Sequence, residues 1–307
     1  MGSEERLRLP VLDFTKEDVK PGTNSWLSTC KFVRHAFEEY GCFVIMYDKA
    51  SDDLQKCLFR SLKELFDLPT ETKMKNIYEG KPLKGYVGQH PKIPLHESMG
   101  IDEGTTLEGI TNFIQKMWPN GNDQLCKYLF EYAKIAEELD KLVSRMIFES
   151  YGLVESYDTY IGSTSYLLRL LAHKAPEQLK PQLGFVSHTD KSFTTILHQN
   201  HVNALMVETK DGNWIDVDFS SPASFVVMAG DALMAWSNDR IKSPNHKVMM
   251  NGNETRYSLG LFAFFRGTLQ VPEELVDEDH PMQYKPFDHL ALLNYTYSVH
   301  IKDYCGV

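Results

Sequence analysis

A series of short apolar runs, separated by turn-forming residues, extends from Tyr166 to Phe265 and constrains the fold more than any other feature of this chain. Turn signals such as Asp211-Gly212 separate the runs, which are shorter than typical helices. Many evenly spaced short strands are typical of a β-sandwich or a jelly roll. We therefore expect strands at residues 166–171, 194–197, 205–208, 213–217, 224–228, 232–236, 248–250 and 257–265.

The first half of the chain is mixed but mainly helical in pattern. Residues 9–14 form a short β-type run, and residues 42–47 are typical of a buried strand. Apolar residues recur at helical spacing in three longer segments, of which the last is the longest. We therefore expect helices at residues 25–40, 52–68 and 123–151, ending near Gly41, Pro69 and Gly152.

Two further segments complete the expected organisation. Residues 76–112 are rich in Gly, Pro, His and Lys without a sustained period, which predicts a long loop. The part of this loop from residue 80 to residue 112 is suited to form a lid over a site. Residues 270–307 return to helical periodicity through 287–295, which predicts a terminal helix that covers the β core.

The predicted fold class is mainly β with flanking helices, around a double-stranded β-helix, or jelly-roll, core, and the strand pattern by itself leaves a β-sandwich open as the alternative. We expect a mainly helical supporting region at residues 1–160, which is mixed α/β in pattern. The catalytic core is predicted at 161–268 and a helical tail packed on it at 269–307, all within one integrated unit.

Charge and cysteine usage exclude several classes of protein. The formal net charge is -10 and no Lys/Arg-rich run is present, which argues against nucleic acid or an anionic membrane as a partner. Five scattered cysteines favour a reducing compartment over a disulfide framework. No apolar segment has the length of a membrane span, and the N-terminus opens acidic and polar, unlike the apolar core of a signal peptide. A cytoplasmic monomer that binds a small molecule is the expectation.

The most informative candidate site is an ordered set of ligand-type residues within the predicted strands. His188 and Asp190 form a His-x-Asp pair, and 55 residues separate Asp190 from His246. Two imidazoles and one carboxylate form the facial triad expected for non-haem Fe(II). Because side chains alternate along a strand, a His-x-Asp pair on one strand points both ligands to the same face. Taken alone, the pair would be a surface pair and His246 an exposed loop residue.

Arg256 and Ser258 follow ten residues after His246 and extend the candidate site. A permanently charged guanidinium pairs bidentately with a carboxylate, and a serine two residues later on the same strand face donates a second hydrogen bond. The pair therefore indicates a dicarboxylate ligand, although a structural salt bridge is the simpler explanation for an arginine on its own. His198 and His201 lie in a polar run that predicts a solvated turn, so we expect them to be decoys.

The chain resembles the plant 2-oxoglutarate- and Fe(II)-dependent dioxygenases through these residues. Further landmarks of that family run along nearly the whole chain. Within the family, the chain most resembles the short enzymes that make alkenyl or hydroxyalkyl glucosinolates. Deoxypodophyllotoxin synthase is another relative by resemblance. The landmarks are LPVLDF near the start, Tyr40-Gly41-Cys42-Phe43, Leu65-Phe66-Asp67-Leu68-Pro69, Gly85-Tyr86, Trp118-Pro119 and Asn213-Trp214.

The resemblance implies a mechanism and a set of cofactors. His188, Asp190 and His246 would hold Fe(II), while Arg256 and Ser258 would hold the distal carboxylate of 2-oxoglutarate. The reaction would use O2, with ascorbate as a reductant, and would release succinate and CO2. The substrate would be a small plant specialised metabolite that loses hydrogen from carbon, with hydroxylation, desaturation or oxidative ring closure, for example of a lignan, as the outcome.

One departure from the family pattern concerns the cosubstrate site. Many members carry Asn-x-Tyr on the strand before the first iron ligand, with the Tyr reaching the keto acid, and the matching residues here are Leu171-Ala172-His173. His173 therefore has three open roles, which are contact with 2-oxoglutarate, contact with the substrate, and core packing.

The predicted substrate pocket contains Arg169, Lys191, Phe262 and Phe264. The two Phe residues share strand parity with Ser258, so they are able to face the barrel interior, although core packing explains them as well. The alternative to a place in the pocket for Arg169 and Lys191 is that both side chains are exposed to solvent. Two other functions compete for the chain as a whole: a non-catalytic small-molecule-binding jelly-roll protein and a zinc hydrolase on a similar triad.

Overall fold

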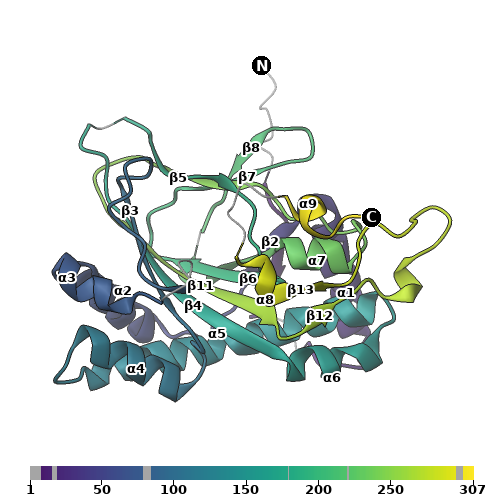
Figure 1. Cartoon of the computed structure of the whole chain (residues 1–307), viewed down its shortest axis with the longest axis horizontal. Coiled ribbons are helices and arrows are strands. Elements are labelled where there is room, and N and C mark those ends of the chain that lie inside the picture. The colour runs from purple at the N-terminus through teal and green to yellow at the C-terminus, as the bar shows by residue number, and fades with distance from the viewer. Residues whose placement is uncertain (1–7, 16–18, 79–83, 179, 220, 295–299) are drawn as a thin grey trace.

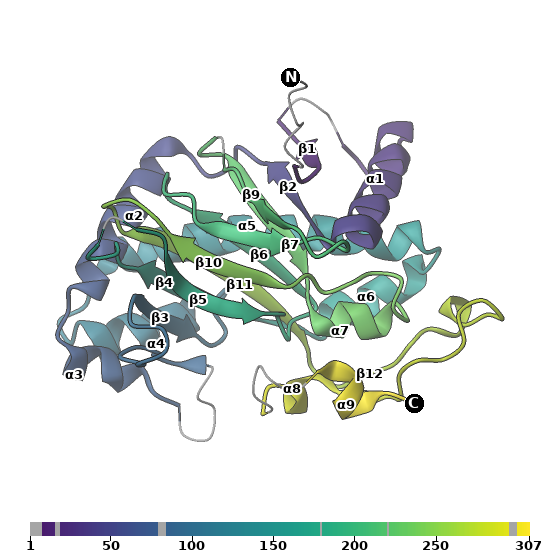
Figure 2. The same ribbon diagram turned by 90° about the horizontal axis from the view of Figure 1, so that it is seen from above.

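The computed structural model has three layers, in which a small sheet lies over a large sheet and helices cover the outer face of the large sheet (Figure 1). It describes residues 8–15, 19–78, 84–178, 180–219, 221–294 and 300–307. Seen from above, the strands of the small sheet lie over those of the large sheet (Figure 2). This is the double-stranded β-helix, or jelly roll, that the sequence predicts.

The large sheet has seven strands in the order β1-β2-β9-β6-β11-β4-β3. Its longest pairing joins β11 to β4 along ten residues, and β11 also pairs with β6 on its other side. Residues before 160 supply three of its strands. The predicted division of the chain into regions at residues 160 and 268 stays a prediction. The strands are β1 (Val11–Asp13), β2 (Cys42–Met46), β3 (His96–Ile101), β4 (Thr164–His173), β6 (Thr194–Gln199), β9 (Ser224–Ala229) and β11 (Arg256–Phe265).

The small sheet has four antiparallel strands in the order β5-β10-β7-β8. In β10, alternate residues are buried, as expected for a sheet with one face toward the core. A two-stranded ribbon, β12–β13, lies near the C-terminus. The strands are β5 (Gln182–His188), β7 (Leu205–Glu208), β8 (Trp214–Asp216), β10 (His246–Met250), β12 (Thr268–Leu269) and β13 (Phe287–Asp288).

The helices form where capping residues and apolar stripes predict them. Thr23 caps the first helix through its side chain, and Gly41, at φ 69°, ends that helix in the left-handed conformation that glycine adopts readily. Among the described residues, no helix is long and apolar enough to cross a membrane. The helices are α1 (Asn24–Tyr40), α2 (Asp52–Phe66), α3 (Thr70–Lys73), α4 (Leu107–Met117), α5 (Asp123–Ser150), α6 (Val154–Gly162), α7 (Asp231–Trp236), α8 (His289–Leu292) and α9 (Ile301–Cys305), with short 3-10 turns at Met74–Asn76 and Glu273–Leu275.

Two predicted elements are wrong. Residues 76–112 are not one long loop, because β3 forms an edge of the large sheet with all six residues buried, and α4 begins at Leu107. Residues 232–236 form helix α7 instead of a strand, and all six residues of this helix are buried. A short, fully buried helix has no polar face, so its apolar run has no helical period that distinguishes it from a strand.

The C-terminal segment also differs from the prediction. Instead of one terminal helix across residues 287–295, the described part contains β13, then α8, and later α9. Residues 295–299 lie outside the described residues. Helix α8 nevertheless packs against β11, so this segment does cover one end of the large sheet.

Candidate active site

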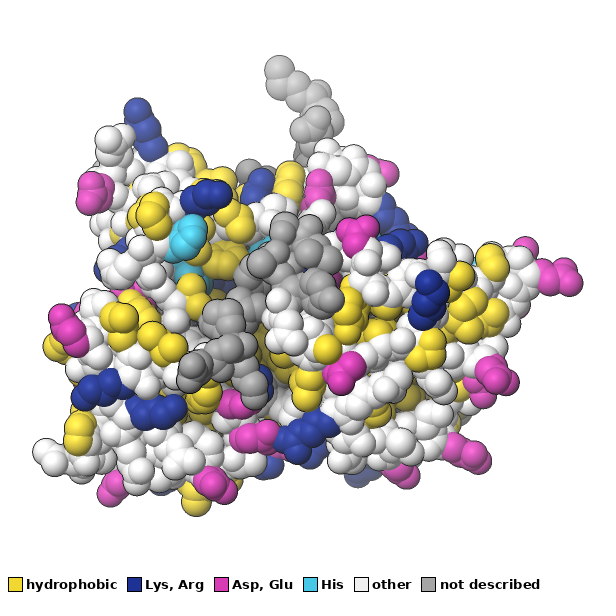
Figure 3. Space-filling model, viewed as in Figure 1, with side chains coloured by type: hydrophobic (Ala, Val, Ile, Leu, Met, Phe, Trp, Pro, Cys, Tyr) yellow, Lys and Arg dark blue, Asp and Glu magenta, His cyan; other side chains and the backbone are white. Residues whose placement is uncertain are grey.

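A cavity of about 350 Å³ lies between the two sheets. Half of the residues that line it are apolar, and the polar half includes histidines from both sheets and two arginines from the large sheet. On the face viewed in Figure 3, histidine and hydrophobic side chains gather where β3 and β5 lie in Figure 1. The polar residues of the wall are His90, Lys92, His96, Ser98, Arg169, His173, His188, Asp190, Lys191, His246, Arg256 and Ser258.

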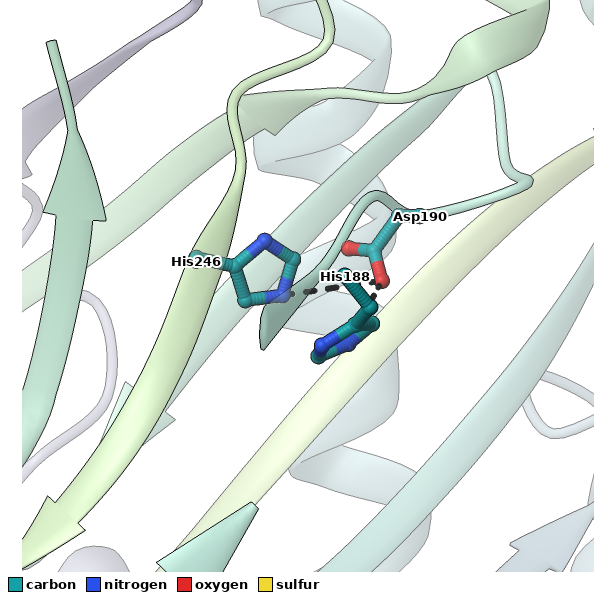
Figure 4. Close-up of side chains that lie close together, drawn as sticks. All are labelled: His188, Asp190 and His246. Atoms are coloured by element: carbon teal, nitrogen blue, oxygen red, sulfur yellow. Dashed lines mark ion pairs between the residues drawn. The ribbon is translucent and has the colours of Figure 1, made fainter. Parts of the chain in front are cut away.

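His188, Asp190 and His246 converge on one point of this cavity (Figure 4). His188 ends β5 and His246 begins β10, and the two residues are direct partners across these antiparallel strands. Oδ1 of Asp190 lies 3.7 Å from Nε2 of His188 and 3.8 Å from Nε2 of His246. One ligand atom from each residue lies within 4.8 Å of the others, so a single metal ion can bind all three.

The position of Asp190 differs from the prediction in one respect. We expected His188 and Asp190 to share a strand face, but β5 ends at His188 and Asp190 lies in the connection to β6. The side chain is held there by a 2.8 Å hydrogen bond that Thr195 donates to Oδ2. Because Oδ2 is occupied in this way, Oδ1 faces the two imidazoles.

The surroundings of both histidines orient them for metal binding. Nδ1 of His188 lies 2.9 Å from the carbonyl oxygen of Val186, and Nδ1 of His246 lies 3.2 Å from that of Pro244. A carbonyl only accepts, so each Nδ1 donates its proton and each Nε2 keeps a lone pair toward the common centre. Burial lowers the pKa of His188 to about 4, which keeps the imidazole neutral. The donor set and its orientation fit Fe(II).

Arg256 is a buried cation on the floor of the same cavity. Its Nε donates to Oε1 of Gln199 at 2.8 Å, and its Nη1 donates to Oγ of Ser258 at 3.1 Å. The amide of Gln199 is itself fixed, because its Nε2 donates to the carbonyl oxygen of Val202 and to Oδ1 of Asn203. Burial lowers the pKa of Arg256 to about 10, so the guanidinium remains charged at neutral pH.

No carboxylate of the described residues forms an ion pair with Arg256. Among those residues, only Asp190 contributes a carboxylate to the cavity wall, and its oxygens face the triad and Thr195. A buried charge normally has a partner, because desolvation costs several kcal/mol per ion. The guanidinium, with Nη2 bonded to none of the described residues, is therefore suited to an acidic ligand.

Strand β3 brings two residues into the site that the sequence analysis missed. His96 and Ser98 line the cavity, and His96 faces His173 across the β3–β4 pair with 3.0 Å between Nδ1 and Nε2. His173 in turn faces Arg256 across the β4–β11 pair, with 3.5 Å between Nδ1 and Nη1. Only Met99 and Ile101 alternate as apolar residues, and the polar Glu97 breaks that alternation, so the sequence contains only a short signal for the strand.

All four predicted pocket residues, Arg169, Lys191, Phe262 and Phe264, line the cavity. Arg169 donates from Nη1 to Oγ of Ser98 at 2.6 Å, and Lys191 forms a buried ion pair with Asp231. The solvent-exposed alternative for Arg169 and Lys191 is therefore wrong, since they are 9% and 5% exposed.

The two histidines expected to be decoys lie outside the cavity wall. His201 is exposed and paired with Glu254, as a solvated turn predicts. His198 is instead buried on β6, where its ring stacks on Phe225 and its Nε2 lies 3.0 Å from the carbonyl oxygen of Pro222. The predicted turn is therefore wrong for His198, since the polar run begins inside a strand.

The predicted lid from 80 to 112 contributes Val87, His90, Lys92 and Ile93 to the cavity wall besides the residues of β3. Residues 79–83 lie outside the described residues. Lid motion stays a prediction.

The fold and site define a jelly-roll metalloenzyme, and comparisons with known proteins identify its family. Residues 162–264 match the model of the 2OG-Fe(II) oxygenase superfamily, and residues 9–101 match that of the "non-haem dioxygenase in morphine synthesis N-terminal" region. A probable 2-oxoglutarate-dependent dioxygenase of Arabidopsis thaliana, AOP1.2, is 40% identical over 94% of this chain and 90% of its own length. The chain therefore belongs to the 2-oxoglutarate- and Fe(II)-dependent dioxygenases.

Other relatives agree with this assignment. The 2-oxoglutarate-dependent dioxygenase AOP3 of Arabidopsis thaliana is 30% identical over 94% of this chain and 93% of its own length. A solved structure of the dioxygenase for auxin oxidation 1 of Arabidopsis thaliana, in a complex with 2-oxoglutarate, superposes with a TM-score of 0.79 at 26% identity, covering 89% of this chain and 99% of that one. The protein is a dioxygenase that uses Fe(II) and 2-oxoglutarate.

Proposed function

We propose that this dioxygenase oxidises a C–H bond of a small organic substrate in the cavity between the two sheets. In this proposal His188, Asp190 and His246 bind Fe(II), and Arg256 and Ser258 bind the distal carboxylate of 2-oxoglutarate. The observation that carries the proposal is the buried guanidinium of Arg256, which lies in the same cavity as the triad and has no carboxylate partner among the described residues.

The residues of the site have distinct roles in this mechanism. Fe(II) and 2-oxoglutarate, when bound, supply the O2-dependent oxidising chemistry, with succinate and CO2 as products. The two imidazoles and Asp190 fix the metal, while the carbonyls behind each Nδ1 prevent ring rotation. Arg256 and Ser258 orient the cosubstrate, and fixed orientation lowers the entropic cost of reaction. The apolar wall excludes water.

His173 belongs to the cosubstrate subsite through Arg256. The 3.5 Å contact between Nδ1 of His173 and Nη1 of Arg256 is long for a hydrogen bond, and the same Nη1 also donates to Oγ of Ser258 at 3.1 Å. In our proposal the imidazole limits the rotation of the guanidinium and acts on 2-oxoglutarate indirectly. This is a positioning role in place of the direct contact that a Tyr makes in related enzymes.

The proposed substrate is a plant specialised metabolite, and hydroxylation, desaturation and ring closure are the possible outcomes. The similarity to the Arabidopsis dioxygenases supports this class. Phe262 and Phe264 supply aromatic surface for it, while Arg169 and Lys191 supply charge. The five free cysteines fit a cytoplasmic location. We propose a monomer by default.

The two competing functions explain less of the site. A non-catalytic binder has no use for a complete triad next to a buried guanidinium, and a zinc hydrolase leaves Arg256 and Ser258 without a role. A retained Zn(II), with no response to added Fe(II), would favour the hydrolase.

The test is succinate release from 2-oxoglutarate by the Fe(II)-loaded enzyme with O2 and ascorbate. We expect specific members of a panel of phenolics, lignans, alkaloids and sulfur-containing glucosides to stimulate succinate release above the substrate-free rate. Asp190→Ala serves as the inactive control. Bound Fe(II) and 2-oxoglutarate without stimulation by any compound of the panel would favour the non-catalytic binder.

A further inference from the structure

A chain of hydrogen-bonding side chains crosses the cavity wall and ends in a guanidinium on each side. Arg169 donates to Oγ of Ser98 at 2.6 Å, and Oγ of Ser98 lies 3.1 Å from Nε2 of His96. Nδ1 of His96 lies 3.0 Å from Nε2 of His173, whose Nδ1 lies 3.5 Å from Nη1 of Arg256. All five residues are nine-tenths buried or more and line the cavity.

The guanidinium of Arg256 fixes the direction of the hydrogen bonds as far as Ser98, whose hydroxyl accepts from Arg169 in either direction. Arginine only donates, so Nδ1 of His173 must accept from Arg256, and the proton of this neutral imidazole is on Nε2. Nε2 of His173 then donates to Nδ1 of His96, which places the proton of His96 on its own Nε2. That Nε2 donates to Oγ of Ser98.

The opposite direction brings two donors together. If Ser98 donated to His96, His96 would donate to His173, and the Nδ1 proton of His173 would face Nη1 of Arg256. Protonation of either imidazole to a histidinium also brings two donors together, because a histidinium donates from both nitrogens. Burial lowers the pKa of His96 to about 3 and that of His173 well below its ordinary value, which agrees with two neutral rings.

The direction of these hydrogen bonds determines what the hydroxyl of Ser98 is able to donate to. Its oxygen accepts from both His96 and Arg169, so its own proton has no acceptor among the hydrogen bonds of the described residues. The hydroxyl lines the cavity, and Nη1 of Arg169 is beside it. A hydroxyl donor next to a guanidinium forms a site for an oxygen that carries negative charge.

We propose that Ser98 and Arg169 form a subsite that binds an anionic oxygen group of the oxidised substrate, a carboxylate or a sulfate. The cavity wall supports a charged group, since Asp190 is its only carboxylate among the described residues and serves the triad. The inference rests on the proposed function for the identity of the ligand as substrate. His96 and His173 are positioning residues that keep the Ser98 proton directed to the cavity.

The first test reads the protons directly. In the enzyme with diamagnetic Zn(II) and 2-oxoglutarate, the ¹⁵N resonances of the histidine rings distinguish protonated from unprotonated nitrogens, and His96→Asn and His173→Asn variants assign the signals. We expect the proton on Nε2 in both rings. A proton on Nδ1 of either ring, or a charged ring, reverses the chain and overturns the proposal.

The second test measures ligand binding to the same Zn(II) and 2-oxoglutarate form, with aromatic carboxylates and sulfates against the neutral amides and alcohols of equal size. We expect the anions to bind preferentially, and Ser98→Ala to weaken the tightest anion by about 10- to 100-fold, as expected for one hydrogen bond to a charged group. Arg169→Gln should have at least this effect. Ser98→Ala keeps the test valid if Arg169→Gln does not fold.

A matched control separates the subsite from general attraction. Lys92 is an exposed cation at the same cavity, so Lys92→Gln removes one positive charge and leaves the hydrogen-bonded series from Arg169 to Arg256 intact. The affinity for the anion should then change less than about 3-fold. No anion among the binders, or an anion preference that survives Ser98→Ala, overturns the proposal. Binding of 2-oxoglutarate is measured separately, and its loss in the parent enzyme would instead contradict the proposed function.

Discussion

The ammonium group of Lys191 lies 2.8 Å from the carboxylate of Asp231, and both side chains are only 3% exposed. Asp231 begins α7, and its backbone N–H donates to the carbonyl oxygen of Asp190 at 2.7 Å. The ion pair and this backbone bond together join the segment that carries Asp190 to the helix that follows β9. The metal-binding carboxylate therefore depends on a buried charge pair that does not itself bind the metal.

Asp231→Ala should destabilise the protein by about 3–5 kcal/mol, because Lys191 would keep a buried charge without its carboxylate. Denaturant unfolding measures the loss. The double variant Lys191→Met, Asp231→Leu should recover most of it, since replacing a buried pair by apolar residues is often neutral. Glu138→Ala, which breaks the exposed pair with Lys49, should cost no more than about 1 kcal/mol. A loss below about 1 kcal/mol for Asp231→Ala would contradict this account.

Asp190→Ala should abolish Fe(II)-dependent turnover, because the triad loses its only charged ligand. Metal content after anaerobic loading and dialysis, measured by elemental analysis, should fall from about one ion per chain to a small fraction of that. Asp216→Ala, at the exposed end of β8, is the control and should retain the metal. Substantial iron-dependent activity in Asp190→Ala would overturn the metal assignment.

The sequence predicted that the triad residues lie together with Arg256 and Ser258, because residue type and order carry that pattern, and the structure brings them to one cavity. Their roles toward the cosubstrate stay a proposal. The sequence did not predict β3, because His96 and Glu97 are polar and their burial depends on partners from distant segments. His96 pairs with His173 and Glu97 with Lys73, at 3.0 and 2.8 Å. A local pattern does not contain those partners. Similarly, burial of His198 requires the ring of Phe225 from another strand.

Arg256→Met should raise the 2-oxoglutarate concentration needed for half-maximal turnover by about 30-fold or more, because a buried charge pair with the distal carboxylate is lost. Bound iron should not change. Ser258→Ala should give a smaller increase, since a single hydrogen-bond donor is removed. Arg266→Gln, at an exposed position, is the matched control. An unchanged requirement in Arg256→Met would assign the carboxylate to another part of the cavity.

Asp140 connects the helical layer to the large sheet and predicts a pH dependence of stability. The carboxylate, on α5, accepts hydrogen bonds from Tyr166 on β4 at 2.9 Å and from Thr194 on β6. Burial raises the pKa of Asp140 from 3.8 to about 6 in spite of these two donors. The folded protein therefore binds this proton more tightly than the unfolded chain does.

The sign of the effect follows from that difference in proton affinity. The stabilisation is fully present below about pH 4 and is lost as the pH rises through about 6, because the unfolded chain releases the proton first. A shift of this size corresponds to about 3 kcal/mol. Asp140→Asn cannot ionise, so its unfolding free energy relative to the parent should rise between pH 4 and 7 in denaturant titrations. Asp216→Asn is the exposed control, and parallel profiles for the parent and Asp140→Asn would contradict a raised pKa.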